Sequence, residues 1–380
     1  MRHTILTTMT KEKEDLVYIK ENEDLLLTEK TTDDIAYKPR MYIIEAGLLT
    51  SYGVLYVDII ERLEVDKVEV SWIGSIRTGI YLGAAPLIVP FTKMVSCRIL
   101  MVIGGIIAFS SLMVSVFLKS FMVLLICLGI FQGVAFALVF VSSNIIVNLY
   151  FDKKRPLAIG LAVCGAGVGQ TVYPLLQDAL LKQYGFSGTM LINAALTLHI
   201  ILSGSTYFPL PTKKTLNTNK KKYTDKNKSI LENLQNAFDF KVFKIPLFVV
   251  FVLHNILLYI GAYVPFSFLP LRVNNRGFSL NDASLFVSMI GLASTTGRIL
   301  VGFMASYMTN FRSQLYVILT FIAGMMVCIA PLCSYYTEFI LFSWGFGIAT
   351  ASDWRNFNQY NAFAHRVDIE KLILNSNKQY

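Results

Sequence analysis

This chain has few charged residues, and it lacks the short motifs that mark most enzyme classes. Only 16% of its 380 residues are charged, against about 25% in a typical soluble domain. The patterns of a phosphate-binding loop, a zinc-protease helix and a nucleophile elbow do not occur in the sequence. We therefore expect neither an enzyme nor a soluble two-domain protein.

Cysteine is also sparse, and its spacing excludes two kinds of small scaffold. The five cysteines have no CxxC or Cys/His spacing, and most lie inside or beside apolar runs. This argues against a disulfide framework and a zinc site, so we expect no metal and no cofactor. The net charge of +9 comes from basic residues in short loops between apolar runs. It indicates membrane orientation, and no nucleic-acid partner is expected.

What the sequence does contain is long apolar runs. The chain is 54% hydrophobic, and many of its runs approach the roughly 20 helical residues needed to cross a bilayer. We therefore predict an all-α membrane protein of about ten transmembrane helices, of which the first is weakened by Glu45 and the last is short. The predicted spans are 42–60, 71–91, 99–118, 121–148, 157–181, 190–209, 245–269, 284–307, 313–334 and 338–352.

The distribution of lysine and arginine predicts the topology. If the N-terminus is cytoplasmic, the cytoplasmic loops hold most of the basic residues, including nine lysines between residues 211 and 244. That segment is polar, typical of a linker, and suited to contact with anionic membrane lipids. The predicted organisation is a cytoplasmic tail (1–40), a six-helix bundle (41–210), a basic cytoplasmic linker (211–244), a partial second bundle (245–352) and a polar tail (353–380).

Residues 150–169 are typical of a cytoplasmic hairpin between two packed helices. Lys153, Lys154 and Arg155 separate two apolar runs, and Pro156 opens the next helix, where its missing N–H is not needed. Glycine is frequent in that helix, and Gly165 and Gly169 form a small-xxx-small face that allows close helix approach.

The same segment resembles the second signature of the monocarboxylate transporter family, a branch of the major facilitator superfamily. Other landmarks resemble that family in the same order, from SWIGSI at 71–76 through YGFSG at 184–188 to Gly297–Arg298. The resemblance covers about residues 47–350. It implies a two-bundle carrier in the plasma membrane, with its substrate site between the bundles. Some family members also need a single-span immunoglobulin-type accessory protein.

The sequence departs from the family pattern at several places. The family's first signature is missing, and the polar residues 351–380 stand where spans eleven and twelve of twelve are expected, which suggests a truncated form. Thr50 and Ser294 occupy positions where the proton–lactate members carry a lysine and an aspartate. The resemblance therefore does not supply the residues for proton coupling.

Arg298 is the main candidate for binding substrate. It lies inside a predicted span, where a charge is costly and usually faces a partner or a cavity. A guanidinium can hold a carboxylate through two parallel hydrogen bonds, and the resemblance implies that role. The alternative is that its side chain reaches the membrane surface.

Further candidates are Thr50, Ser51 and Tyr52 before Gly53, Asn144 in the fourth span, and Ser294. Their alternative role is hydrogen bonding to backbone or between helices. The sequence thus predicts a carrier of organic monocarboxylates or related small solutes, working by alternating access, with facilitated or otherwise coupled transport. The alternative is a truncated, non-transporting relative that regulates such a carrier.

Overall fold

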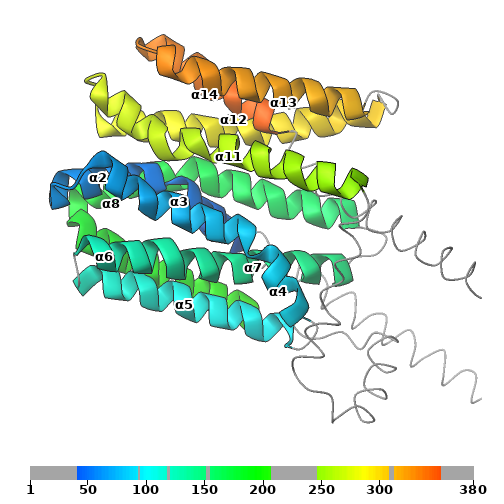
Figure 1. Ribbon diagram of the computed structural model, residues 1–380, viewed down its shortest axis with the longest axis horizontal. Helices are drawn as coiled ribbons and strands as arrows, with labels where there is room; N and C mark the ends of the chain where they lie inside the picture. The colour runs from blue at the N-terminus through cyan, green and yellow to red at the C-terminus, as the bar shows by residue number, and fades with distance from the viewer. Residues whose placement is uncertain are drawn as a thin grey trace, which may run out of the picture.

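The computed structural model describes residues 41–92, 95–117, 120–150, 155–206, 246–307 and 312–351. Within these ranges every regular element is a helix, which confirms the all-α prediction. The helices lie side by side with their long axes running in roughly the same direction (Figure 1). The predicted tails 1–40 and 353–380 and the predicted linker 211–244 fall outside the described residues.

The first two predicted spans are both bent. The helix Met41–Thr50 meets α2 (Tyr52–Leu63) at Ser51 with an angle of 42°. The helix α3 (Lys67–Gly83) meets α4 (Ala85–Phe91) at Ala84 with an angle of 45°. Prolines at the start and inside of α4 account for the second bend, because proline removes a backbone donor and crowds the preceding turn.

The remaining helices before residue 206 follow the predicted spans. They are α5 (Cys97–Phe117), the continuous run of α6 (Phe121–Leu124), a π-helix (Leu125–Phe131) and α7 (Gln132–Tyr150), and α8 (Arg155–Ser205). The long α8 contains the fifth and sixth predicted spans, joined at Gly185. Gly185 has φ 64° and ψ −174°, a backbone conformation that glycine adopts without the cost a side chain would add.

Four longer helices and one short turn follow residue 246. They are α11 (Pro246–Asn275), α12 (Leu280–Tyr307), α13 (Arg312–Ile329), a 3₁₀ turn (Ala330–Leu332) and α14 (Tyr336–Thr350). By length and composition, five of the described helices could cross a membrane, or up to seven if each bent pair is one span. We call the helices of residues 41–205 the first half and those of residues 246–350 the second half.

The surface and interior of this bundle have the polarity expected in lipid. Large apolar side chains such as Phe117, Leu257 and Phe321 are about 70% exposed or more. Several polar side chains are buried instead, including Gln132, Gln177 and Asn193. The Gln177 and Asn193 amides bond to each other at 3.0 and 3.2 Å within the two arms of α8. Hydrogen bonding inside the bundle thus replaces water for these groups.

Glycines bring the two halves into backbone contact along two helix pairs. On α2, a Cβ at Gly53 would collide with the carbonyl oxygen of Phe266 on α11. On α12, a Cβ at Gly291 would lie 2.6 Å from the carbonyl carbon of Gln170 and 2.7 Å from the amide of Thr171, both on α8. The predicted role of Gly169 in helix packing is confirmed, because a Cβ there would collide with the backbone carbonyl of Ile43.

Substituting Gly291 by alanine is expected to destabilise the protein, because the new methyl group meets backbone atoms that cannot rotate away. Overpacking of this kind costs about 1–3 kcal/mol. Gly324→Ala on α13 is the matched control, since a Cβ there has no neighbour within 4 Å and gains the same helix propensity. The measurement is the melting temperature of detergent-solubilised protein, which should fall only for Gly291→Ala. Equal shifts in both variants would contradict the close α8–α12 contact.

Candidate functional site

The bend in the first span is braced by an arginine that the sequence analysis did not single out. Arg77 on α3 is 5% exposed, and it donates to the carbonyl oxygens of Leu48 (3.4 Å) and Leu49 (2.8 Å). Those carbonyls lie just before the bend at Ser51, where the helix from Met41 ends. The guanidinium carbon also lies 4.5 Å from the ring centroid of Tyr52, in cation–π geometry.

Arg77 is therefore held by dipoles and a ring face, and the described residues give it no carboxylate as an ion-pair partner. Its Nε atom is buried and has no hydrogen-bond partner. The sequence could have pointed to Arg77, because a single charged residue inside a predicted span usually has a functional or structural role. The contacts with Leu48 and Leu49 could not be read from the sequence, because they join helices 28 residues apart.

The candidates Thr50, Ser51 and Tyr52 all lie at this bend, and all three are buried. The Thr50 hydroxyl donates to the carbonyl of Ala46 at 2.8 Å within its own helix, which was its alternative role. The Tyr52 hydroxyl donates to the carbonyl of Val70 at 3.0 Å. The Ser51 hydroxyl is fully enclosed and has no hydrogen-bond partner. The structure thus brings these three residues together with Arg77.

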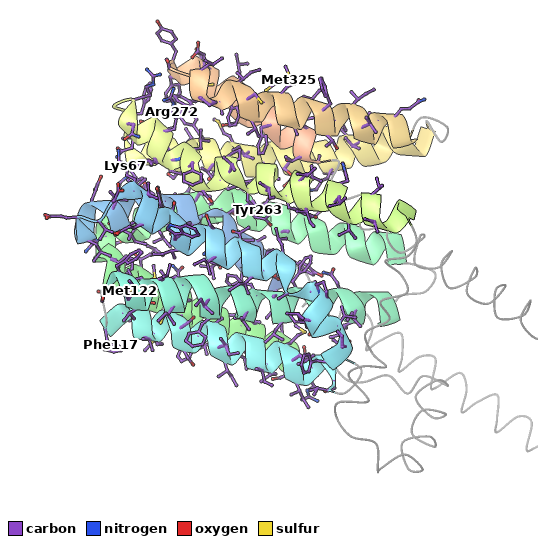
Figure 2. The ribbon with its side chains drawn as sticks, viewed as in Figure 1. Lys67, Phe117, Met122, Tyr263, Arg272 and Met325 are labelled. Carbon is purple, nitrogen blue, oxygen red and sulfur yellow. The ribbon has the colours of Figure 1, made fainter. Side chains whose placement is uncertain are left out.

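A buried carboxyl group lies on the same helix, one and a half turns before Thr50. Glu45 is 2% exposed, and neither of its carboxylate oxygens has a hydrogen-bond partner. The Tyr81 side chain on α3 approaches the carboxyl group. Tyr263 of α11, in the second half, packs against the cluster of buried side chains that contains Tyr81, and its ring centroid lies 6.4 Å from that of Tyr259. Tyr263 lies midway along α11, on the side that faces α3 (Figure 2).

Sequence reasoning noted Glu45 only as a residue that weakens the first span. A single acidic residue near the start of an apolar run is ambiguous, because it can lie at the membrane surface as easily as in the bundle. The structure removes this ambiguity by placing the carboxyl group among tyrosines inside the bundle.

Asn144 belongs to a second polar group, on α7. Its side-chain oxygen accepts a hydrogen bond from the Tyr42 hydroxyl at 3.0 Å, and its amide nitrogen donates to the carbonyl of Phe140 at 2.9 Å. The Ser143 hydroxyl lies 3.1 Å from the same Tyr42 oxygen. Because Tyr42 is one turn from Glu45 on the helix Met41–Thr50, this group adjoins the buried carboxyl group.

Arg298 and Ser294 lie one turn apart on α12. Arg298 is half-buried, and one of its terminal nitrogens, Nη1, lies 3.3 Å from where a Cβ would stand on Gly167 of α8. Thr295 contacts the same glycine. Ser294 is 2% exposed, and its backbone nitrogen lies 3.1 Å from the Cβ position of Gly347 on α14. Arg298 therefore lies at the boundary between the halves, which the sequence could not establish.

Of these polar groups, Arg298 lies at the boundary between the two halves, and Tyr52 is next to Gly53, which contacts α11 of the second half. A guanidinium at this boundary can bind an anion, while hydroxyl and amide groups can orient it. Among the described residues, no group of three or more His, Cys, Asp or Glu side chains could hold a metal ion.

A family model described as Major Facilitator Superfamily matches residues 41–367, which extends beyond Thr350. The Mus musculus protein "Monocarboxylate transporter 10" is 28% identical over 295 residues, 76% of this chain and 58% of that protein. The Gallus gallus protein "Monocarboxylate transporter 4" is 29% identical over 254 residues, 67% of this chain and 52% of that protein. The chain thus spans less than three fifths of the length of these curated relatives.

Solved structures share the fold at low sequence identity. A bacterial homolog of the human lysosomal transporter Spinster, in an inward-facing and occupied conformation, matches with a TM-score of 0.62 and 17% identity. The match covers 86% of this chain and 73% of that one. The unoccupied inward-facing structure gives a TM-score of 0.59, also at 17% identity, with 86% of this chain and 74% of that one covered. This likeness supports the transporter fold.

Replacing Arg77 by lysine should destabilise the protein although the charge is kept. One ammonium group cannot reproduce the forked contact with two carbonyls together with the stacking on Tyr52. The expected cost is about 1–3 kcal/mol, the usual range when buried hydrogen-bond partners are lost. Arg62→Lys is the control, because the Arg62 side chain is 41% exposed and pairs with Asp58 on its own helix. Thermal unfolding in detergent measures both, and equal melting temperatures would contradict the bracing role of Arg77.

Proposed function

Because this chain belongs to the major facilitator superfamily and its relatives are monocarboxylate transporters, we propose that it transports organic monocarboxylates or related small solutes. Membership of this family makes it a multi-pass membrane transporter and not an enzyme. In this proposal the two halves rock against each other, so that a central site opens to each side of the membrane in turn.

The observation that carries the proposal is the position of Arg298. Its guanidinium lies at the crossing of α8 and α12, where Gly167 leaves no side chain between the helices. A carboxylate entering at this boundary can accept two parallel hydrogen bonds from one guanidinium, and low dielectric strengthens both. Arg298 is half-buried, so a bound anion there would contact both halves at once. This is the placement that alternating access requires.

The other candidate residues complete the proposed site from the first half. Ser51 has a buried hydroxyl without a partner at the bend of the first span. Thr50 and Tyr52 flank it, and Asn144 is oriented by Tyr42. We assign these groups to the uncharged part of the solute. Ser294 lies one turn before Arg298 and supplies no charge, so we assign the binding of the anionic group on α12 to Arg298.

The contacts between halves support a rocking movement. Tyr56 on α2 and Phe268 on α11 meet edge to face with ring centroids 5.8 Å apart, and Lys67 donates to Asn275 at 3.4 Å. In Figure 2 Lys67 lies near the end of the bundle, away from Tyr263 at the middle of α11. Contacts of this kind, between side chains at one end, can separate without unfolding either half.

We further propose that the protein lies in the plasma membrane with its N-terminus in the cytoplasm and anionic lipid at its basic linker. We also propose a single-span immunoglobulin-type accessory protein as a partner, because some family members need one. The alternative function, a non-transporting regulatory relative, is not favoured, because the family model matches residues of both halves.

Replacing Arg298 by alanine should abolish most uptake of the transported anion. Charge-assisted hydrogen bonds of this kind contribute about 1.5–3 kcal/mol, which corresponds to a fall of roughly tenfold or more at low substrate concentration. Arg298→Lys should recover part of the activity, and Arg276→Ala, at an exposed turn, should retain parental uptake. The measurement is uptake of labelled monocarboxylates and amino acids in expressing cells, normalised to surface protein. Parental uptake by Arg298→Ala would show that Arg298 is not the anion site.

A further inference from the structure

The enclosed carboxyl group of Glu45 has no role in the site described so far. We propose that Glu45 binds one proton and releases it in each transport cycle, so that the anion and the proton move together. This inference rests on the proposed transport function. It assigns the coupling to a residue that differs from Thr50 and Ser294, the positions where the proton–lactate members carry charged residues.

The surroundings of Glu45 favour a proton over any larger cation. Both carboxylate oxygens are buried, and neither accepts a hydrogen bond. A metal ion or an ammonium group would need room and several further oxygen ligands. Among the described residues, Glu45 does not belong to any group of three or more acidic, histidine or cysteine side chains that could hold a metal ion. A proton needs no room, because it binds directly to one carboxylate oxygen.

Enclosure also makes the ionised form of Glu45 costly in this conformation. An unpaired carboxylate in an apolar interior is disfavoured by several kcal/mol. The nearest cation on α3, Arg77, is directed at the carbonyls of Leu48 and Leu49 instead. The titratable and charged groups around the Glu45–Tyr81 pair are Tyr42 on its own helix, Arg77 on α3, Tyr173 on α8, Tyr259 and Tyr263 on α11, and Arg298 on α12.

Movement of the two halves would open this enclosure. Tyr81 and Glu45 belong to the first half, whereas Tyr263, which packs against the buried cluster that contains Tyr81, belongs to the second. If α11 moves away from α3, water replaces Tyr263 beside the pair. Glu45 can then ionise by releasing its proton to water, because hydration restores the stability of the carboxylate.

The Arg298 guanidinium and Glu45 are separated by about 6 Å along the axis of α8. On α8, Gly167 contacts Arg298 and Gly169 contacts Ile43, and two helical residues rise about 3 Å. Glu45 follows Ile43 by two residues on its own helix, a further rise of about 3 Å. An anion held by Arg298 would therefore repel an ionised Glu45, and a proton on Glu45 removes that repulsion. Anion binding and proton binding thus favour each other.

The charges balance in the proposed cycle. The proton forms one O–H bond to a carboxylate oxygen of Glu45 on one side of the membrane and is transferred to water on the other. One monocarboxylate anion crosses with it, so the complete step moves no net charge. Uptake should therefore be stimulated by a proton gradient and insensitive to the membrane potential.

The test uses the full chain, purified and reconstituted into liposomes, with a labelled monocarboxylate that the parent protein transports. An inward proton gradient of one pH unit should raise parental uptake several-fold. Glu45→Gln should lose this stimulation, while exchange of labelled for unlabelled substrate at equal pH persists. Glu61→Gln is the matched control, because Glu61 is exposed, and His254→Gln tests the histidine of α11. Both should keep the stimulation, as should Glu45→Asp.

The outcomes separate this inference from the function on which it rests. If the parent transports no monocarboxylate, the proposed function fails. If the parent transports one without proton stimulation, or if Glu45→Gln is stimulated as the parent is, the role of Glu45 is wrong. Loss of stimulation in His254→Gln with stimulation retained in Glu45→Gln would assign the proton to α11 instead.

A spectroscopic measurement covers the case in which Glu45→Gln does not transport. Infrared difference spectra of the purified protein at neutral pH should contain the C=O stretch of a protonated carboxyl group. The band should be present in the parent and in Glu61→Gln and absent from Glu45→Gln. Its persistence in Glu45→Gln would overturn the proposal.

Discussion

The close crossing of α8 and α12 is the contact on which the rest of the arrangement depends. Gly291 lets two helices from different halves touch along their backbones, and Gly167 leaves room for the side chains of Thr295 and Arg298. Larger residues at these two positions would prevent both contacts. The crossing places Arg298 at the boundary and brings it to the level of the helix Met41–Thr50, which packs on α8 at Gly169 and Tyr173. The proposed anion site and the buried carboxyl group thus share one supporting helix.

The three ionisable side chains Arg77, Arg298 and Glu45 have different surroundings inside this bundle. Arg77 is held by two carbonyls and an aromatic ring, at a bend where the helical hydrogen-bond pattern is interrupted. Arg298 lies half-buried beside a glycine. Glu45 has the least support, with a tyrosine nearby and no accepted hydrogen bond. Because an unsupported charge is costly in lipid, Glu45 is the group whose protonation state should change most when the halves move.

Much of the fold could be predicted from the sequence, because long apolar runs and basic loops reflect the bilayer directly. The helices agree with the predicted spans within a few residues, and Gly185 lies in the predicted turn. The bends at Ser51 and Ala84 were not predicted. The first depends on contacts with Arg77 from another helix, and the second on prolines whose effect within an apolar run is hard to judge.

The site was predictable only in part. Arg298 stood out as a charge within a span, and Asn144 as an amide that needs a partner. Neither Tyr42 as that partner nor Gly167 as the neighbour of Arg298 could be read from spacing, since each pairs residues about a hundred or more positions apart. Glu45 and Arg77 were missed as a functional group because their meaning depends on burial, which only the packed bundle reveals.

The most direct test of the central claim is counterflow in liposomes that contain only the purified chain and a high internal concentration of one unlabelled monocarboxylate. The account predicts that external labelled monocarboxylate accumulates transiently above its external concentration, saturably, and not in protein-free liposomes. Uptake no greater than in protein-free liposomes, for every monocarboxylate tried with correctly folded protein, would contradict it.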